Sequence, residues 1–221
     1  MARTNTEVWV VNHLSDSVSI VEIDPTTVTR SHVTRTLLVG DEPRDIVIAG
    51  SVSHNRVFIT CARRGQNRFP TTPDTGPQFT TQGVGRADVW AFNADAPGAP
   101  LGGTPLSIIQ LFGDTPRALA ASPNGATVYA AVFHSGNRTT TINEPSRNGF
   151  LALPPPPPGG RTDGPSTGLI VKFSGGIWRD ELGRNWSSRV NFTLPDKDVF
   201  LIDADQNPPA AASGTNFVTD V

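Results

Sequence analysis

A five-residue motif, Gly-Asp-x-Pro-Arg, occurs twice in this chain, each time before a short apolar run. The two copies read VGDEPRDIVIAG at residues 39–50 and FGDTPRALAASPNG at residues 112–125. Self-similarity of this kind is typical of repeat architectures, in which each copy forms one supersecondary unit that stacks on its neighbours. We therefore expect several similar units rather than one irregular fold.

Two further patterns recur around the motif. A valine precedes an aromatic residue at Val8-Trp9, Val57-Phe58 and Val128-Tyr129. A valine also stands six residues before an aspartate at Val18–Asp24, Val89–Asp95 and Val199–Asp205. Because aspartate side chains accept hydrogen bonds from the backbone of turns, we expect these aspartates to cap the turns after their strands.

The repeated segments predict β-strands. They are short, rich in Val, Ile, Phe and Trp, and bounded by Gly, Pro, Asn or Asp, whereas helical spacing is nearly absent. Four strands recur in order: the run after Pro-Arg, the Val-aromatic strand, the Val-to-Asp strand and the strand before the next Gly. Four-stranded antiparallel units in series are the blades of a β-propeller. The predicted fold class is therefore all-β, a β-propeller with about three blades present and long loop insertions.

The predicted organisation is a single partial propeller domain over residues 1–221. Its blades span about 7–39, 43–112 and 116–221, and the third contains an insertion at about 134–197, in which an apolar run at 168–173 predicts an extra strand. By strand count, the first blade lacks its innermost strand and the third its outermost. Since propellers usually close with about four to eight blades, we expect a fragment of a longer propeller, or a ring completed by other chains.

The first copy, VWVVNHLSDSVSIVEID followed by LLVGDEPRDIVIAG, resembles the YVTN-type β-propeller repeat. Asn12 keeps the asparagine of that repeat, whereas Cys61 and Val132 replace it. The resemblance implies a surface-layer or other extracytoplasmic protein, periplasmic or secreted, from a bacterium or archaeon. The first residues, MARTNTEVWVVNHLSD, contain no apolar signal region, so this location depends on the resemblance alone.

Composition excludes several classes of function. The net charge is −2 and the 18 Lys and Arg residues are scattered, which argues against a nucleic-acid partner. Cys61 is the only cysteine, so an intrachain disulfide and a cysteine-rich zinc site are excluded. No apolar run approaches the length of about 18 residues that predicts a membrane-spanning helix. We expect no cofactor, no metal site and no catalytic residue.

Propeller topology predicts one candidate ligand site. It places the motif turns on the same face as two long insertions, 62–86 and His134 to about 196. The predicted ligand-binding residues are Arg44, Arg117, Arg63, Arg64 and His134. Arginine suits carboxylate and phosphate groups, so the ligand would be anionic. In the alternative, Arg44 and Arg117 only brace the strand ends by pairing with Asp41, Asp45 or Asp114.

A second candidate is the segment WRDELGRNW at 178–186, where two acidic residues lie between two tryptophans. The predicted partner-binding residues are Trp178, Asp180, Glu181 and Trp186. In the alternative, these aromatic residues only anchor their own loop.

The sequence thus predicts a noncatalytic binding or scaffold module. Its partner would be a protein or a small anionic ligand on the loop-rich face, or the remainder of the propeller in a longer chain. One alternative is the propeller portion of a redox enzyme whose haem or quinone centre lies outside this sequence. A less favoured one is a propeller-type lactone hydrolase, which would need carboxylate and histidine ligands in the channel.

Overall fold

A computed structural model describes residues 1–51, 55–68, 84–136, 138–142, 169–190 and 196–219. These residues belong to two compact units. The first comprises Met1–Ser135 and Leu194–Val221, and the second comprises Gly136–Thr193, within the insertion predicted at about 134–197. Each unit is described separately below.

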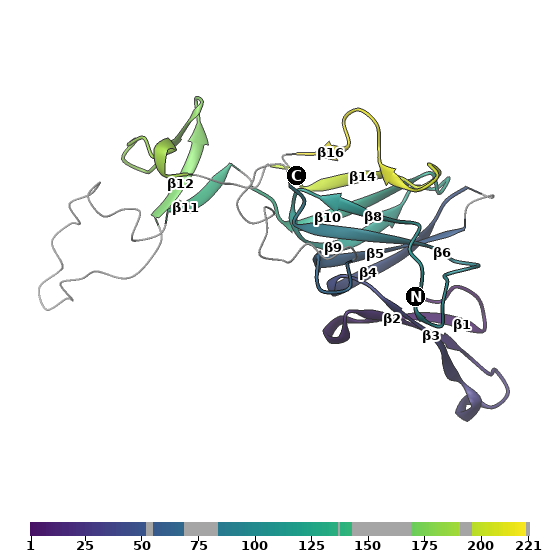
Figure 1. Cartoon of the computed structure of the whole chain (residues 1–221). Helices are drawn as coiled ribbons and strands as arrows, with labels where there is room; N and C mark the ends of the chain where they lie inside the picture. Colours follow the sequence, from purple (N-terminus) through teal and green to yellow (C-terminus); the bar gives the residue numbers. More distant parts are fainter. Residues whose placement is uncertain (52–54, 69–83, 137, 143–168, 191–195, 220–221) are drawn as a thin grey trace, which may run out of the picture. The chain divides into compact units, whose positions relative to one another are not determined.

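The described residues of the first unit form three sheets (Figure 1). The first sheet has the strand order β1 (Glu7–Asn12), β2 (Ser17–Glu22), β3 (His32–Leu38) and β7 (Leu101–Gly102). The second sheet has the order β4 (Asp41–Ala49), β5 (Arg56–Arg63), β6 (Ala87–Asn93) and β8 (Ser107–Leu111). The third sheet contains β9 (Asp114–Ala121), β10 (Thr127–His134) and β14 (Val199–Asp203), with β15 (Ala210–Ala211) and β16 (Phe217–Val218) both paired to β14.

Neighbouring strands are antiparallel except β3 and β7, which run parallel. The helical segments among the described residues are single 3-10 turns: η1 (His13–Ser15), η2 (Val28–Arg30) and, in the second unit, η4 (Ser187–Arg189). The predicted all-β class is therefore confirmed. The expectation that the third sheet lacks an outermost strand is wrong, because β15 and β16 occupy that edge of β14.

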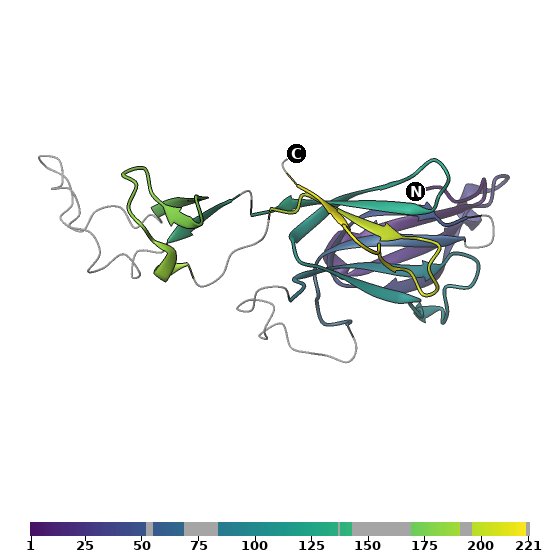
Figure 2. The same cartoon turned by 90° about the horizontal axis from the view of Figure 1, so that it is seen from above.

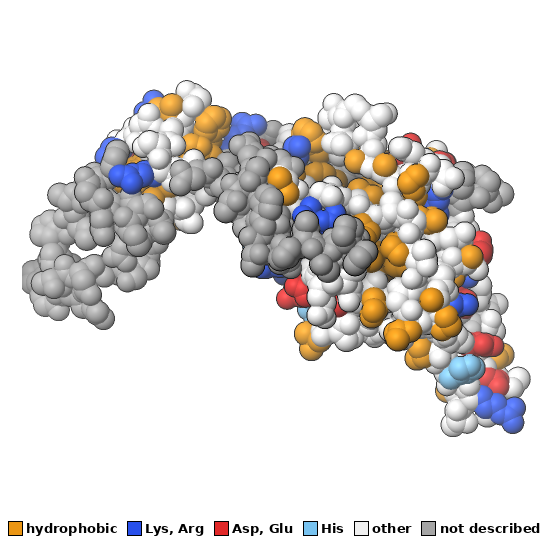
Figure 3. Space-filling view, in the orientation of Figure 1, with side chains coloured by type: hydrophobic (Ala, Val, Ile, Leu, Met, Phe, Trp, Pro, Cys, Tyr) orange, Lys and Arg blue, Asp and Glu red, His pale blue; other side chains and the backbone are white. Residues whose placement is uncertain are grey.

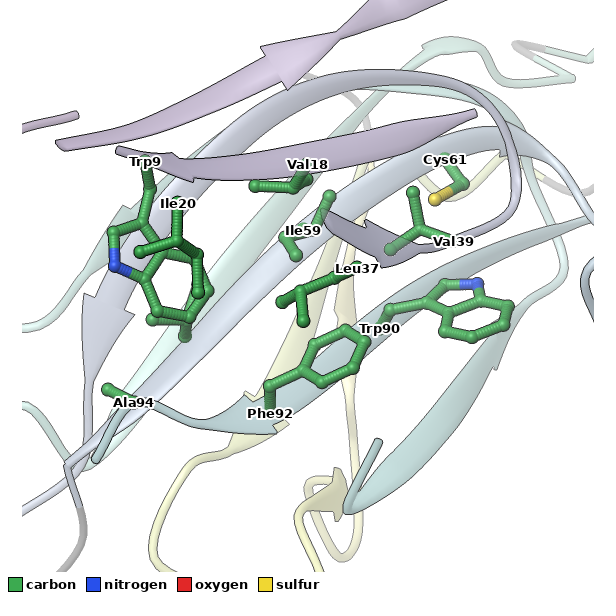
Figure 4. Packing of buried hydrophobic residues seen from close by; sticks show 11 residues of the cluster. Trp9, Val18, Ile20, Leu37, Val39, Ile59, Cys61, Trp90, Phe92 and Ala94 are labelled. Atoms are coloured by element: carbon green, nitrogen blue, oxygen red, sulfur yellow. The ribbon is translucent and has the colours of Figure 1, made fainter. Parts of the chain in front are cut away.

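The second sheet lies between the other two (Figures 1 and 2). Toward the first sheet, it packs Ile59, Trp90 and Phe92 against Trp9 and other side chains of β1–β3, as Figure 4 shows. The indole Nε1 of Trp9 donates to Glu7 Oε1 (2.7 Å), so the polar atom of this fully buried ring is paired. Burying each large apolar side chain here stabilises the fold by roughly 1.5–3 kcal/mol.

The opposite side of the second sheet packs against the third sheet. Phe58, Val89 and Ala91 of the second sheet contact a cluster that includes Val128 and Ile202 of the third. Strands with both faces covered carry apolar residues almost continuously. This explains why β6, with the sequence ADVWAFN, is buried from Ala87 to Phe92.

Polar groups join the second and third sheets at one end of their strands. Buried Arg56, at the start of β5, donates to the carbonyl oxygens of Ala204 and Gln206, the latter at 2.6 Å. The Gly50 amide donates to the Gly125 carbonyl (2.8 Å). Burial lowers the pKa of the Arg56 guanidinium, and the nearby carboxylate of Asp205 opposes that shift.

The predicted turn caps are correct in one of three cases. Asp24 Oδ1 accepts hydrogen bonds from the Thr26 hydroxyl (2.7 Å) and from the Thr26 and Thr27 amides (2.8 and 2.9 Å), and these bonds, that of the hydroxyl most of all, lower its pKa. After β6 and β14, Asn93 and Asp203 make the corresponding bonds. Asp95 and Asp205 instead bond elsewhere: Asp95 accepts from Arg3 and Asn55, and Asp205 from the Ser51 amide.

The second unit is a small three-stranded antiparallel sheet of β11 (Thr139–Ile142), β12 (Leu169–Ser174) and β13 (Ile177–Arg179). Among the described residues of this unit, Ile142, Val171 and Trp186 form a buried core. The extra strand predicted at 168–173 is confirmed as β12. In the part of the chain that the structure describes, no helix has the length and apolarity needed to cross a membrane.

Candidate functional site

The two Gly-Asp-x-Pro-Arg copies share an unusual backbone conformation at their central residue. Glu42 and Thr115 have φ values of 49° and 54°, in the left-handed region that non-glycine residues seldom adopt. The prolines that follow, Pro43 and Pro116, are buried. Residues held in such conformations cluster at functional sites, where the surrounding structure maintains them.

The strand after each turn contains a shift in pairing. On β4 the register with β5 shifts between Pro43 and Ile46, and on β10 the register with β9 shifts between Ala131 and Val132, the partner of Pro116. Proline has no amide hydrogen for the sheet, and an irregularity of this kind redirects the adjacent side chains. Arg44 and Arg117 lie next to these shifts, and both side chains are exposed.

Each arginine is held by a neighbour on its own sheet. Arg44 Nη2 lies 2.9 Å from Glu42 Oε2, in the same turn. The Arg117 guanidinium lies over the ring of Phe133, 3.9 Å from its centroid, in a cation–π contact. The bracing alternative named Asp41, Asp45 or Asp114 as carboxylate partners of these two arginines, and the carboxylate beside Arg44 is that of Glu42.

Asp45 and Asp114 have other contacts. Asp45 Oδ2 accepts a hydrogen bond from the Leu119 amide (2.7 Å), which joins β4 to β9. Asp114 Oδ2 lies 3.5 Å from Arg86 Nη2. Because Asp45 follows Arg44 directly and Leu119 lies two residues after Arg117, the two arginines lie near this hydrogen bond, on the facing strands β4 and β9 of the second and third sheets.

The remaining basic residues of the predicted set lie at the same strand ends. Arg63 is opposite Asp41 in the β4–β5 register, and His134 is opposite Asp114 in the β9–β10 register. Both side chains are exposed. Arg64 differs, since it is buried and donates to Gln110 Oε1 (2.8 Å). The structure therefore presents Arg44, Arg63, Arg117 and His134 to solvent.

Asp88, a charged residue that sequence analysis missed, lies under this end of the second sheet. It is fully buried, and its Oδ2 lies 3.1 Å from Arg68 Nε. The only signal for it was an aspartate within the otherwise apolar ADVWAFN run. Asp88 is opposite Cys61 in the register. Burial, together with the charges of Asp88 and Asp16, raises the pKa of the Cys61 thiol, which therefore stays neutral at physiological pH.

On the face of the first unit visible in Figure 3, charged side chains are scattered among uncharged ones. Among the described residues, no group of three or more His, Cys, Asp or Glu side chains is arranged to hold a metal ion. We call the end of the second and third sheets that carries Arg44, Arg63, Arg117 and His134 the motif end. The exposed basic side chains at this end suit recognition of an anion.

The second candidate segment forms an internal anchor around Asp180. Its Oδ2 accepts from Trp186 Nε1 (2.9 Å) and Arg184 Nε (2.6 Å), and its Oδ1 accepts from the Arg184 amide (2.9 Å). Burial opposes ionisation of Asp180, but the bonds from Trp186 and Arg184, with the Arg184 charge, outweigh it and lower its pKa.

The other residues of this segment differ in exposure. Trp186 is fully buried. Trp178 is half-buried and packs on Phe173, with ring centroids 5.3 Å apart, whereas Glu181 is exposed. Trp186 therefore supports its own loop, which is the role that the alternative interpretation gave to the aromatic residues, and Asp180 holds its indole. A partner contact through Trp178 and Glu181 stays a prediction.

No protein-family model matches the chain, and no curated protein shows significant similarity to its sequence.

Proposed function

We propose that the first unit is part of a β-propeller and that the chain is a noncatalytic binding module, which holds an anionic ligand or an acidic partner surface at the motif end. Three sheets whose strands follow one another in chain order, with antiparallel pairing throughout except between β3 and β7, support the propeller, as does the covering of the middle sheet on both sides. The proposal also includes an extracytoplasmic location in a bacterium or archaeon, which the YVTN-type resemblance supports.

One observation carries the binding function. Arg44 and Arg117 occupy the same position of the two motif copies, both are exposed, and each is already held by a neighbouring side chain. A guanidinium that is restrained before binding loses less conformational entropy when it binds. Two such groups on neighbouring strands suit an anion with several oxygen atoms, such as phosphate or a carboxylic acid.

The states of the Cys61 thiol and the Asp45 carboxylate favour binding over catalysis. The Cys61 thiol is buried with a raised pKa, so it is not an activated nucleophile. Asp45 is engaged with backbone amides, including that of Leu119. Asp45 therefore joins β4 to β9, whereas Arg44 and Arg117 are exposed to solvent.

Titration calorimetry with inorganic phosphate and with citrate, at low ionic strength, tests this function. The double variant Arg44→Met/Arg117→Met should bind at least about tenfold more weakly, because hydrogen bonds to charged groups are each worth about 1.5–3 kcal/mol. The matched control is Arg30→Met, an exposed arginine in η2 outside the motif end, which should bind like the unsubstituted protein.

Glu42→Gln gives a second, opposite result. The glutamine amide oxygen can still accept a hydrogen bond from Arg44, but the negative charge beside the proposed anion site is removed, so phosphate should bind more tightly. If no anion binds, or if the double variant and Arg30→Met bind alike, the proposed site is wrong.

A further inference from the structure

We propose that the first unit associates head to tail with a second copy of this chain, with the outer face of the third sheet packed on the outer face of the first. Each outer face is the side turned away from the second sheet. The third-sheet outer face carries Tyr129, Phe133, Val199 and Leu201. The first-sheet outer face carries Val8, Val10, Ser19 and Val21.

Strand alternation assigns these residues to the outer faces. Val128, Ala130 and Val132 pack toward the second sheet, so Tyr129 and Phe133 point the opposite way. In β2, Val18 and Ile20 pack toward the second sheet. Ser19 and Val21 therefore lie on the other side.

The exposed fractions of three aromatic side chains indicate that the third-sheet outer face is suited to packing against another sheet. Trp9, Phe58 and Tyr129 follow the valine at the second position of the corresponding strand in each sheet. Trp9 and Phe58 are fully buried against the next sheet, whereas Tyr129 is 38% exposed. Tyr129 thus occupies a position at which the first and second sheets bury an aromatic side chain against the next sheet.

The first sheet shows the complementary pattern. Ile59 and Ala130 occupy matching positions in the second and third sheets and are fully buried against the preceding sheet. Val10, at the same position of the first sheet, is 41% exposed. The first sheet therefore exposes an apolar side chain at a position where the other two sheets bury one against the preceding sheet.

The sizes of the side chains on the two outer faces favour a second copy of this chain as the partner. On the first-sheet outer face, Ser19 and Val21 stand where the second sheet has Trp90 and Phe92. This face is therefore less bulky than its counterpart inside the unit.

The third-sheet outer face is bulkier than the corresponding face of the second sheet. Phe133 stands where the second sheet has buried Ala62, and Leu201 stands where it has Ala91. A bulkier face and a smaller face fill one interface to normal density, because protein interiors tolerate neither voids nor overlap.

Polar side chains of the first-sheet outer face are already paired with one another. Asn12 Nδ2 donates to Ser17 Oγ (3.2 Å) and to Ser19 Oγ (2.8 Å). Covering this face therefore leaves the amide donors of Asn12 satisfied, and a buried donor without a partner would otherwise cost about 1–3 kcal/mol.

Two copies related by a twofold axis would form the same contact twice. Three sheets from each copy then give six in a closed ring, within the usual range of about four to eight propeller blades. This closure rests on the propeller arrangement of the proposed function. The head-to-tail contact itself depends only on the two outer faces.

Light scattering coupled to size exclusion, applied to the 221-residue chain over the micromolar range, tests the association. The protein should have twice the 23.5 kDa mass of one chain. Leu201→Glu, on the third sheet, and Val10→Glu, on the first, should each give monomers. Val28→Glu, which places the same charge at a 78% exposed site in η2, should remain a dimer.

Mixing the two disrupted variants tests the head-to-tail geometry. A Leu201→Glu chain keeps an intact first-sheet face and a Val10→Glu chain keeps an intact third-sheet face, so the mixture should form dimers with one intact interface. If Leu201→Glu unfolds, as judged by circular dichroism, Tyr129→Glu replaces it.

A monomer at every concentration would overturn the inference, as would a dimer that survives Val10→Glu, because third sheets would then pack on each other. Phosphate binding by a monomeric variant separates the two proposals. If that variant binds phosphate while the unsubstituted chain is also monomeric, only the association is wrong. If the unsubstituted chain dimerises but binds no anion, only the binding function is wrong.

Discussion

At the scale of single residues, Asp180 shows how one buried carboxylate organises a small unit. It accepts hydrogen bonds from the indole of Trp186 and from both the backbone and the side chain of Arg184. Among the residues that the structure describes, the core of the second unit has three buried apolar side chains, and one of them is Trp186. Loss of the Asp180 carboxylate should therefore lower the stability of the whole second unit.

Asp180→Asn should destabilise the second unit by about 1–3 kcal/mol, because an amide nitrogen cannot accept the bonds from Arg184 or Trp186. Urea unfolding followed by the Trp186 indole N–H resonance measures this change. The matched control is Glu181→Gln, which removes the neighbouring exposed carboxylate and should have little effect. Equal effects of the two variants would contradict the anchoring role.

The same carboxylate predicts a pH dependence. The pKa of Asp180 is lower in the folded protein than the ordinary value of about 3.9. Its contribution to stability is therefore complete above that ordinary value and is lost as the pH falls through the folded pKa. Asp180→Asn should remove this part of the acid sensitivity of the second unit.

Residue roles were only partly predictable from the sequence. Asp24 could be identified as a cap, but Asn93 and Asp203 could not, because a cap must be the first residue of its turn, and the turn begins after a different number of residues in each copy. Strand ends depend on pairing with other strands. For the same reason Asp88 was missed, since its ion pair with Arg68 brings together residues twenty positions apart.

At the scale of elements, the connection between β4 and β5 meets the turn between β9 and β10 through two glycines. The Gly50 amide donates to the Gly125 carbonyl. Gly125 has a φ of +74°, and a Cβ on it would lie 2.5 Å from the Gly50 carbonyl oxygen. Both the backbone conformation and the space therefore require glycine at this turn.

Gly125→Ala should destabilise the first unit far more than Gly102→Ala. Gly102 has a φ of +91°, but no atom lies within 4 Å of the position that a Cβ would occupy, so its substitution adds only backbone strain of about 1–2 kcal/mol. The clash with Gly50 should add about 1–3 kcal/mol to that strain in Gly125→Ala. Urea unfolding followed by the indole resonances of Trp9 and Trp90 makes the comparison, and equal losses would show that the turns are not in contact.

The long strands were predictable because their residues alternate or are continuously apolar over several positions. β15 and β16 were not, since each has only two residues and carries no periodicity. The exposed arginines of the candidate site were predictable from the repeated motif, whereas the cation–π contact between Arg117 and Phe133 depends on how β9 pairs with β10.

At the scale of the whole molecule, the middle position of the second sheet predicts the order of local opening. Amide hydrogens of β5 and β6 should exchange most slowly, because both faces of these strands are covered. Those of β15 and β16, which are short edge segments, should exchange much faster. Hydrogen exchange followed by NMR measures this order, and stronger protection of β15 than of β6 would contradict it.

The double coverage of the second sheet also limits how this protein can evolve. A substitution on either side of β5 or β6 disturbs one of two packed interfaces, so these strands have little freedom to acquire new specificity. Diversification of what the protein recognises is therefore confined to the ends of the strands and to the segments inserted between them, where residues can change without altering the packing beneath.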